Sequence, residues 1–312
     1  MNNNALIDIG IICYNHEKLI QQCVESVLSQ KTDFPYRIFI IDDCSDDETP
    51  GILRRLKNKH KDKIHLELNT QNKGVIENAK KLSELFTATY CCWMDADDFW
   101  TYSSKLQTQV DFLETHKEYA GCFHDASIIS SVDNSDSKMA NRSHQHHKMY
   151  SQANLYKPDI YPSDIINRII VPTASLVYRN TDIAPMIQRI GISLSLSWII
   201  HLEIIKNSRF RYFNACWSAY RDHPQGYSKK FSLVDYKLQI IKVLKYLLSD
   251  AYYKHNKAAV YESLASEYYH LIEAMHHENQ GMHEIKKHIR AFKSYHKQAG
   301  KFIAEELKKH AE

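Results

Sequence analysis

The most chemically suggestive stretch of the sequence is Trp93–Trp100, which places three carboxylates within four residues. The apolar run before them, Tyr90–Met94, predicts a buried strand. Because side chains alternate along an extended chain, Asp95 and Asp97 are expected to point the same way. Neighbouring carboxylates repel each other unless a cation or hydrogen-bond donors lie between them. A divalent metal that carries a phosphate meets this need, since hard oxygen ligands suit Mg²⁺ or Mn²⁺. A solvated acidic loop is the simpler interpretation of the motif in isolation.

Composition and charge narrow the class of protein. The chain has 312 residues, 44% hydrophobic and 25% charged, which is typical of a globular protein with one large domain, or one domain and an appendage. A formal net charge of +3 is too small to indicate nucleic acid as the main partner. The N-terminus lacks a signal-peptide pattern, and no apolar run approaches the roughly 18–20 residues that span a bilayer. Seven cysteines without CxxC spacing do not fit a zinc site or a disulfide framework. We therefore expect a cytoplasmic protein.

Strands and helices alternate through the first part of the chain. The predicted strands are Ile7–Cys13, Arg37–Ile41, Ile64–Leu68 and Tyr90–Met94. The predicted helices are Glu17–Ser29, Ile52–Asn58, Val75–Leu85 and Lys105–His116. This alternation is typical of βαβ units and a mainly parallel sheet, in which ligands bind beyond the carboxyl ends of the strands. The polar clusters Tyr14–Glu17, Asp42–Asp47 and Asp95–Asp98 all follow strand ends, so they are expected to converge on one site.

The sequence patterns in the middle of the chain predict further strands and helices, which alternate less regularly than those before them. They are a strand at Ala120–Ile129, a polar, His-rich loop at Ser130–Asn154, a helix at Asp164–Ile170, a strand reached through Pro172–Tyr178, an amphipathic helix at Leu196–Lys206, and a strand at Phe210–Tyr220. A turn-rich segment, Arg221–Gly226, ends this part of the chain.

From Ser232 onward the patterns are helical only. Helices are predicted at Leu233–Ser249, Lys257–His276 and Met282–Lys309, so we expect a first domain of residues 1–231 and a C-terminal helical region of residues 232–312. The last helix carries eight basic and three acidic residues. Its basic face is either a solvated face of a helix packed on the core, or a contact with an anionic membrane surface or with a second copy in a homo-oligomer.

Six motifs in order resemble a known family. They are Ile11–Glu17, Ser26–Gln30, Ile40–Asp47, Asn72–Gly74 with Asn78, Met94–Trp100 and Tyr220–His223. Residues 1–225 resemble a bacterial-type family 2 glycosyltransferase with the GT-A fold, and the C-terminal helical region lies outside the resemblance. The family implies an α/β, Rossmann-like fold with a mainly parallel sheet flanked by helices, here followed by an all-α extension.

The resemblance implies a nucleotide-diphosphate sugar as donor. Tyr14 would stack on the base, and Asp43 or Asp42 would accept a hydrogen bond from a base N–H. Lys73 would add positive charge near the diphosphate, and Gly74 would permit a tight turn. The full set assigned to nucleotide-sugar binding is Tyr14, Asn15, Glu17, Asp42, Asp43, Lys73, Gly74, Asn78, Asp95 and Arg221. Without the resemblance, the Asp42–Asp47 cluster would be read as a helix N-cap and the Lys73-Gly74 pair as an ordinary turn.

The resemblance also implies a metal site, which would hold Mn²⁺ or Mg²⁺. Asp97 would be the direct ligand, Asp95 would assist at the ribose or the metal, and His223 would close over the metal or the diphosphate. A lone histidine beside a proline is otherwise more typical of a structural turn.

The sequence departs from the family at the catalytic base. Family members place an acidic residue just before an aromatic residue that opens a helix, and here that position is Ser197, which cannot act as a base at neutral pH. The nearest titratable substitutes, His201 and Glu203, lie one turn later, and His124 and Asp125 at another strand are further candidates.

The sequence therefore predicts a metal-dependent, inverting glycosyltransferase of the hexosyltransferase type. We expect it to transfer a sugar, from a UDP-sugar or a similar donor, to a glycan or lipid-linked acceptor in surface polysaccharide or lipopolysaccharide synthesis, peripherally at the inner membrane face. The alternative is a nucleotide-sugar-binding module that lacks the usual base. A nucleotidyltransferase would require a Gly-rich, basic loop after the first strand, and Cys13–His16 does not supply one.

Overall fold

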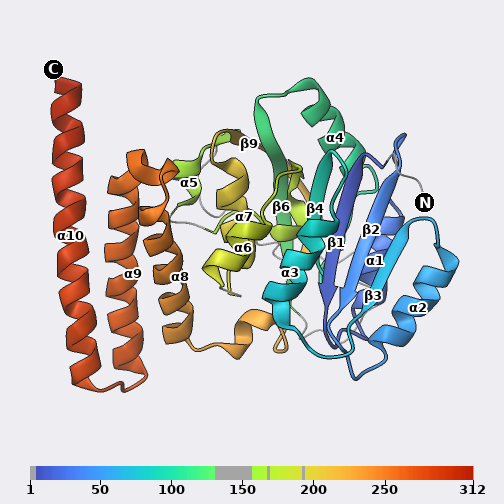
Figure 1. Ribbon diagram of the computed structural model, residues 1–312, viewed down its shortest axis with the longest axis horizontal. Coiled ribbons are helices and arrows are strands. Elements are labelled where there is room, and N and C mark those ends of the chain that lie inside the picture. Colours follow the sequence, from blue (N-terminus) through green and yellow to red (C-terminus); the bar gives the residue numbers. More distant parts are fainter. Residues whose placement is uncertain (1–4, 131–156, 167–168, 192–193, 312) are drawn as a thin grey trace. The chain divides into compact units, whose positions relative to one another are not determined.

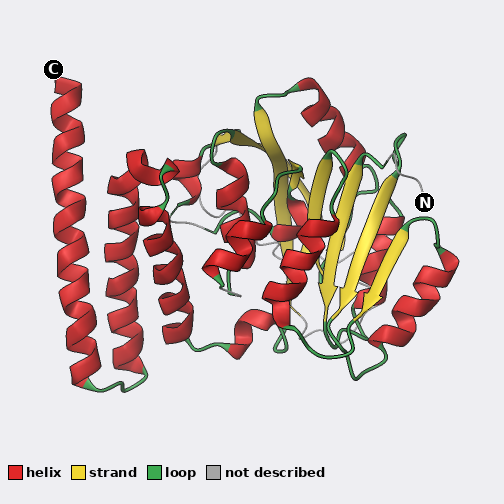
Figure 2. Cartoon of the chain, viewed as in Figure 1, coloured by secondary structure: helices red, strands yellow, loops and turns green. Residues whose placement is uncertain are grey.

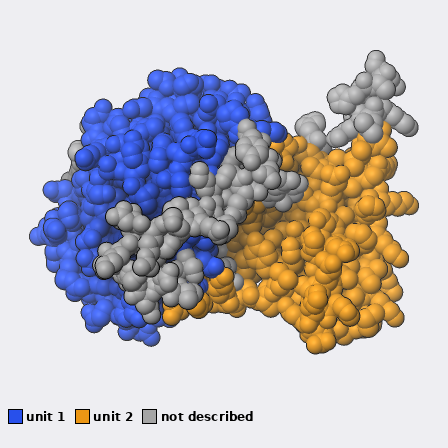
Figure 3. Space-filling model, turned by 180° about the vertical axis from the view of Figure 1, so that it is seen from behind, with its two compact units in different colours: residues 1–161, 170–193, 203–223 blue, residues 162–169, 194–202, 224–312 orange. Residues whose placement is uncertain are grey.

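The computed structural model describes residues 5–130, 157–166, 169–191 and 194–311. The predicted loop at Ser130–Asn154 lies outside the described residues except for its first position. The chain forms two compact units, coloured separately in Figure 3: residues 1–161, 170–193 and 203–223 make unit 1, and residues 162–169, 194–202 and 224–312 make unit 2. The domain boundary at residues 231 and 232 stays a prediction.

Unit 1 is built on one mixed sheet. The strands are β1 (Ile7–Cys13), β2 (Tyr36–Asp42), β3 (Ile64–Leu68), β4 (Tyr90–Asp95), β5 (Phe99–Trp100), β6 (Tyr119–Ser130), β7 (Asp159–Ile160), β8 (Val177–Arg179) and β9 (Arg209–Asp222). Their order is β3-β2-β1-β4-β8-β6-β9-β5, and β7 also pairs with β9 (Figure 1). The first four strands are parallel, β8 is antiparallel to both β4 and β6, and β6 is parallel to β9. The predicted α/β fold is confirmed, with an antiparallel part that the sequence patterns did not indicate.

Helices precede and follow these strands (Figure 2). They are α1 (Ile20–Leu28), α2 (Thr49–Lys59), α3 (Gly74–Leu85), α4 (Lys105–Thr115), α5 (Pro162–Ile165), α6 (Ala184–Ile190) and α7 (Leu196–Ile205). Most of the predicted helices form, with ends that differ by a few residues. The helix predicted at Asp164–Ile170 is wrong in its bounds, because α5 ends at Ile165 and residues 169 and 170 are not helical. The short elements α6, β5 and β7 were not predicted. The amphipathic character predicted for α7 is wrong, because residues on all of its sides, from Trp198 to Ile205, are largely buried.

The alternation of side chains along β1 explains the layers of unit 1. Ile9 and Ile11 are fully buried in the core that also contains Val24 of α1. Gly10 faces the other way, where an added Cβ would lie 2.5 Å from Leu82 Cδ2 of α3. The missing side chain therefore lets α3 pack closely on the strand that leads to the first polar loop.

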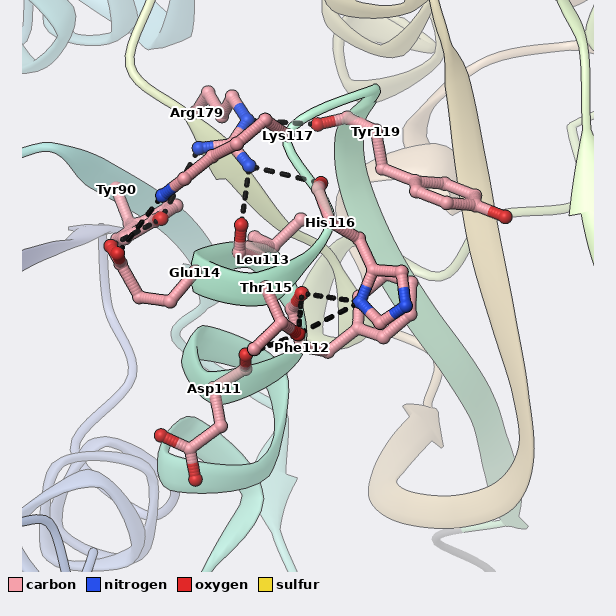
Figure 4. Close-up of polar contacts among 10 residues, drawn as sticks. All are labelled: Tyr90, Asp111, Phe112, Leu113, Glu114, Thr115, His116, Lys117, Tyr119 and Arg179. Carbon is pink, nitrogen blue, oxygen red and sulfur yellow. Dashed lines mark hydrogen bonds and ion pairs between the residues drawn. The ribbon is translucent and has the colours of Figure 1, made fainter.

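Arg179 of β8 ties the end of α4 to the sheet (Figure 4). Its guanidinium group donates to the carbonyl oxygens of Leu113 and His116, and its Nε donates to Tyr119 O at 2.9 Å. The last carbonyls of a helix have no partner within the helix, so a cation placed there satisfies them and interacts favourably with the helix dipole. The phenol of Tyr90 joins this cluster, donating to Glu114 Oε1 at 2.6 Å.

Unit 2 contains α8 (Leu233–Ser249), α9 (Lys257–His277) and α10 (Met282–Ala311), which confirms the three predicted C-terminal helices. A capping box begins α8. Aromatic pairs hold α9 and α10 together: Tyr261 stacks on Phe302 with ring centroids 5.3 Å apart, and Tyr268 on Tyr295 at 5.4 Å. Within the described ranges, no helix combines the length and apolar character needed to cross a membrane.

Candidate active site

Two loops at the carboxyl ends of β1 and β2 are hydrogen-bonded to each other. Asn15 N donates to Ser45 Oγ at 2.9 Å, and Asn15 Oδ1 accepts from Asp46 N at 3.0 Å. Glu17 N donates to Asp47 Oδ2 at 3.0 Å. The Asn15 side chain therefore fixes the second loop, and Asn15 itself has a left-handed φ of 58° that asparagine tolerates well.

The two hydrogen-bonded loops form what we call the frame. Asp42 and Tyr14 contribute differently to it. Asp42 is buried and binds Ser45 twice, accepting from Ser45 N at 3.0 Å and from Ser45 Oγ at 2.6 Å. Ser45 is thus used inside the loop. Asp47 of the same cluster meets the start of α2, because its Oδ1 accepts from Thr49 N at 2.9 Å. Tyr14 is 38% exposed at the rim of the frame, which leaves part of its ring accessible to a ligand.

Asp43 anchors the turn that precedes α3. Its Oδ1 accepts from Lys73 N at 2.8 Å and from Asn69 Nδ2 at 3.0 Å, and its Oδ2 accepts from Gly74 N at 2.9 Å. Burial disfavours the ionised carboxylate, but these hydrogen bonds outweigh burial and lower the pKa of Asp43 from its ordinary value. Gly74 has a φ of 79°, a conformation that strongly favours glycine.

Two of the predicted donor-site residues lie on either side of this anchor. Asn78 is fully buried, and its Oδ1 accepts from Asn69 Nδ2 at 2.8 Å, so it supports the anchor from inside the protein. The Lys73 side chain is exposed to solvent, while its backbone is fixed by Asp43.

The acidic motif at the end of β4 is joined to the end of β9. His223 Nε2 lies 3.0 Å from Asp97 Oδ2, and both side chains are largely buried. Asp98 is buried and accepts from Arg221 N at 3.0 Å. The Arg221 guanidinium donates to the carbonyl oxygen of Asp97 and stacks on Phe99 at 4.6 Å from the ring centre. Residues of β4 and β9 that are distant in sequence therefore form one cluster.

Negative charge is concentrated in this cluster. Desolvation, followed by the charge of Asp97, raises the pKa of Asp95 to about 7, although the Asp95 side chain itself reaches solvent; a hydrogen bond from Thr173 opposes the rise. Burial and the charges of Asp95 and Asp97 raise the pKa of Asp98 well above its usual value. Burial and the same carboxylates raise the pKa of Tyr220 to about 12. The site thus has an unmet demand for positive charge, which a bound cation would satisfy.

The carboxylate and imidazole side chains of this cluster are suitable ligands for a divalent metal ion, but the protein supplies few of them. Asp97 and His223 are brought together, whereas Asp95 binds Thr173. Throughout the described ranges there is no group of three or more His, Cys, Asp or Glu side chains arranged to hold a metal ion. A metal at the Asp97–His223 pair would therefore need further oxygen ligands, such as those of a diphosphate.

The candidate bases have unfavourable surroundings. Burial lowers the pKa of His201 to about 3, so its imidazole is neutral and a poor proton acceptor. Glu203 Oε2 forms an ion pair with Lys206 Nζ at 2.7 Å. His124 and Asp125 are both fully buried. The assignment of His201 and Glu203 stays a prediction.

Two residues of the cluster were not predicted from the sequence. Thr173 hydrogen-bonds Asp95 from the short 3₁₀ helix Thr173–Ser175, and Gln22 of α1 accepts from Arg221 through its Oε1. Neither carries a motif, since a threonine before a strand and a glutamine on a helix are ordinary residues.

Comparison with known proteins identifies relatives of the first part of the chain. The model of a family described as glycosyl transferase family 2 matches residues 8–170. An uncharacterized protein of Mycobacterium tuberculosis is 26% identical over 221 residues, which cover 70% of this chain and 60% of that protein. The chain thus spans about 60% of the length of this relative. The putative teichuronic acid biosynthesis glycosyltransferase TuaG of Bacillus subtilis is 31% identical over 112 residues, 36% of this chain and 43% of TuaG.

Solved structures share the fold at low sequence identity. TarS 1-349 of Staphylococcus aureus, in complex with UDP-GlcNAc, superposes with a TM-score of 0.63 and 15% identity, covering 93% of this chain and 80% of that one. The mannosyltransferase PcManGT of Pyrobaculum calidifontis, in complex with GDP-Man and Mn²⁺, gives a TM-score of 0.56 and 14% identity, covering 96% of this chain and 84% of that one.

Proposed function

Because the chain belongs to glycosyl transferase family 2 and has the GT-A fold, we propose that it is a metal-dependent, inverting glycosyltransferase that uses a nucleotide-diphosphate sugar. The observation that carries this proposal is the pairing of Asp97 and His223, 3.0 Å apart at the ends of β4 and β9, within a cluster of carboxylates that needs a cation. Metal-assisted departure of a nucleoside diphosphate uses this combination of charge and ligands.

The nucleoside would bind at the frame formed by the first two polar loops. Tyr14 would stack on the base, and Asp42, Asn15 and Glu17 would hold the loops in place. The Asp43 carboxylate accepts hydrogen bonds from the backbone of residues 73 and 74. Its first role would therefore be to hold this turn so that Lys73 is presented to the diphosphate. Solved proteins of this fold bind UDP-GlcNAc and GDP-Man, which supports a donor of this class.

The metal would be Mn²⁺ or Mg²⁺. Asp97 and His223 would hold it, with Asp95 assisting, and the diphosphate oxygens would complete its coordination. When bound, the ion would supply positive charge against the leaving diphosphate. Arg221 would keep the Asp97 loop in position through its bonds to the Asp97 carbonyl and, from its backbone, to Asp98.

The acceptor would be a glycan or a lipid-linked saccharide. A relative named for teichuronic acid biosynthesis supports a role in surface polysaccharide synthesis. We place the enzyme in the cytoplasm, peripherally at the inner membrane face.

Donor turnover tests the proposal. The purified chain is incubated with UDP-glucose, UDP-GlcNAc or GDP-mannose, with Mn²⁺ or EDTA, and released UDP or GDP is measured. We expect metal-dependent release from one donor and a loss of roughly 10²–10³-fold in Asp97→Asn, because the substitution removes charge that stabilises the transition state. Asp62→Asn is the matched control, since Asp62 is exposed on the surface. Absence of release from a broad set of sugar nucleotides, with and without glycan acceptors, would refute the enzyme proposal.

A second candidate function is a nucleotide-sugar-binding module without turnover. It is favoured by Ser197 at the position where a base is expected, and by the low pKa of His201. Calorimetry would then show metal-dependent donor binding by a protein that releases no nucleotide.

A further inference from the structure

The exposed face of α10 carries a row of positive charges, which we call the cationic stripe. It consists of Lys286, Arg290, Lys293, Lys297 and Lys301, all exposed. At about 100° per residue these positions fall within an arc of roughly 80°, and the row is about 22 Å long. Among the described residues of α10, the acidic side chains lie outside this arc, although Glu305 approaches Lys301 at 3.9 Å. Like charges three and four residues apart destabilise a helix, so the stripe does not serve the stability of α10.

An apolar groove runs between α9 and α10, which lie side by side (Figure 1). It has a volume of about 460 Å³. Most of its lining is small or hydrophobic: Ala265 and Tyr269 of α9, and Phe292, Ala299, Gly300 and Ile303 of α10. Tyr269 is 48% exposed there. One acidic residue, Glu262, also borders the groove.

The stripe and the groove are adjacent in the middle of α10, where the groove residues extend from Phe292 to Ile303. Three groove residues of α10, Phe292, His296 and Gly300, are each followed directly in sequence by a stripe residue. Because consecutive residues of a helix are about 100° apart, the stripe forms one rim of the groove. A hydrocarbon channel with a cationic rim is complementary to a molecule that has an apolar chain and an anionic head.

The same arrangement argues against two other occupants. A second copy that packed the same face antiparallel to this one would bring the two stripes together, and the repulsion would be poorly screened at close range. A soluble polyanion would use the stripe and leave the groove open to water. The apolar face of α10 is already packed on α9, through the Tyr261–Phe302 and Tyr268–Tyr295 stacks, so α10 cannot itself embed in a bilayer.

We propose that the α9–α10 face binds an anionic lipid bilayer, with the cationic stripe on the headgroup phosphates and a hydrocarbon chain in the groove. This inference rests on the proposed function for its meaning, because it names the surface through which the enzyme would reach a membrane-borne acceptor. Vesicle binding needs no sugar donor, so it can fail or succeed independently of turnover.

Vesicle co-sedimentation of the full chain tests the stripe. We expect binding to vesicles that contain phosphatidylglycerol, and little binding to phosphatidylcholine alone. Replacing Lys293, Lys297 and Lys301 with glutamine should weaken binding by roughly a hundredfold, since each basic residue near an anionic surface contributes about a factor of five. Salt should weaken binding of the natural chain in the same direction.

A charge-matched control separates this surface from net charge. It replaces three exposed lysines of unit 1, Lys31, Lys59 and Lys61, with glutamine. The control should bind anionic vesicles like the natural chain. Equal loss of binding in both variants, or equal binding to neutral vesicles, would overturn the proposal.

Gly300 tests the groove without a risk to folding, because an added Cβ would meet no atom within 4 Å. Gly300→Ala should bind vesicles normally. Gly300→Gln places a polar side chain where the hydrocarbon would lie and should weaken binding by about tenfold or more, as burial of two or more methylenes is lost. Both substitutions favour the helix over glycine, so circular dichroism and melting should show α10 intact.

The remaining outcomes are decisive as well. Unchanged binding by Gly300→Gln would overturn the hydrocarbon chain in the groove. A dimer that the stripe variant abolishes, in a chain that binds no vesicles, would identify a second copy as the occupant and overturn the proposal. Vesicle binding without donor turnover would support this inference while the proposed function fails.

Discussion

Replacing Asp43 with asparagine would test whether this carboxylate holds the turn that precedes α3. Asp43 accepts hydrogen bonds from the backbone of Lys73 and Gly74 and from the side chain of Asn69. Asparagine has one oxygen in place of two, and its amide group is a donor. In the least costly orientation, the amide nitrogen replaces Oδ2 and faces Gly74 N, so that one hydrogen bond becomes a contact between two donors.

The magnitude follows from the bonds that change. A hydrogen bond to a charged group contributes about 1.5–3 kcal/mol, and the two remaining bonds lose their ionic partner. We therefore expect Asp43→Asn to lower the free energy of unfolding by about 2–4 kcal/mol. For a protein of this size the corresponding fall in Tm is roughly 3–6 °C. The turn that presents Lys73 would also loosen, and the affinity for UDP would fall.

The pH dependence provides an independent check of the mechanism. The folded-state pKa of Asp43 lies below the unfolded value of about 3.9. Its ionisation therefore stabilises the fold above that value, and this stability is lost as the pH falls through the folded-state pKa. The difference in Tm between the natural chain and Asp43→Asn should be full at pH 7 and should shrink below about pH 4.

The assay is thermal unfolding followed by circular dichroism at pH 7 and at acidic pH, with UDP binding measured by calorimetry. Asp62→Asn is the control, because Asp62 is exposed and its replacement should change Tm little. Equal Tm values for Asp43→Asn and the natural chain at pH 7 would refute the reasoning. So would a difference in Tm that persists undiminished in acid.

Three further predictions concern the scaffold. Arg179→Met should lower the free energy of unfolding by about 2–4 kcal/mol, because carbonyls at the end of α4 lose their donor; an effect no larger than that of Lys117→Met, at an exposed neighbour, would contradict this. The folded-state pKa of His201, about 3, lies below its unfolded value, so stability should fall as the pH drops below about 6.5. Between pH 6.5 and 5 this loss is about 1.6 kcal/mol, and denaturant unfolding of His201→Phe should lack it. Gly10→Ala should cost about 1–3 kcal/mol through its contact with Leu82, and an unchanged urea midpoint would disprove the close packing of α3.

The sequence predicted the parallel half of the sheet because its signals are local. The apolar run at Ile7–Cys13 and the helical spacing that follows it are readable within a few residues, and β1 and α1 form there. The antiparallel pairing of β4 with β8 joins Tyr90 to Arg179, and no local pattern encodes a partner so distant. The short elements β5 and α6 were missed for lack of length, since two or seven residues give too little periodicity to recognise.

At the candidate site, the sequence motifs predicted the types of residue but not the surroundings in which the fold places them. Asp97 and His223 were predicted from motifs, and the structure brings them together. The role of Thr173 depends on where the chain places it, and nothing in its sequence context marks it. His201 was a reasonable base by residue type, yet α7 is buried on all sides, and burial decides the pKa of the imidazole.

The contact between the first two polar loops and the contact at the acidic motif enclose very different lengths of chain. This difference affects the order in which the two contacts can form while the chain is being synthesised. The bond between Asn15 and Ser45 closes 30 positions, whereas the Asp97–His223 pair closes 126. The longer closure costs about 1.3 kcal/mol more in chain entropy, so the contact between the first two polar loops has the lower barrier to forming first. On the ribosome, at about 5–20 residues per second, the acidic loop would wait roughly 6–25 s for its histidine to be synthesised. During that interval a nascent chain already contains both of the first two polar loops, while the carboxylates of the acidic loop still lack the partners that β9 brings.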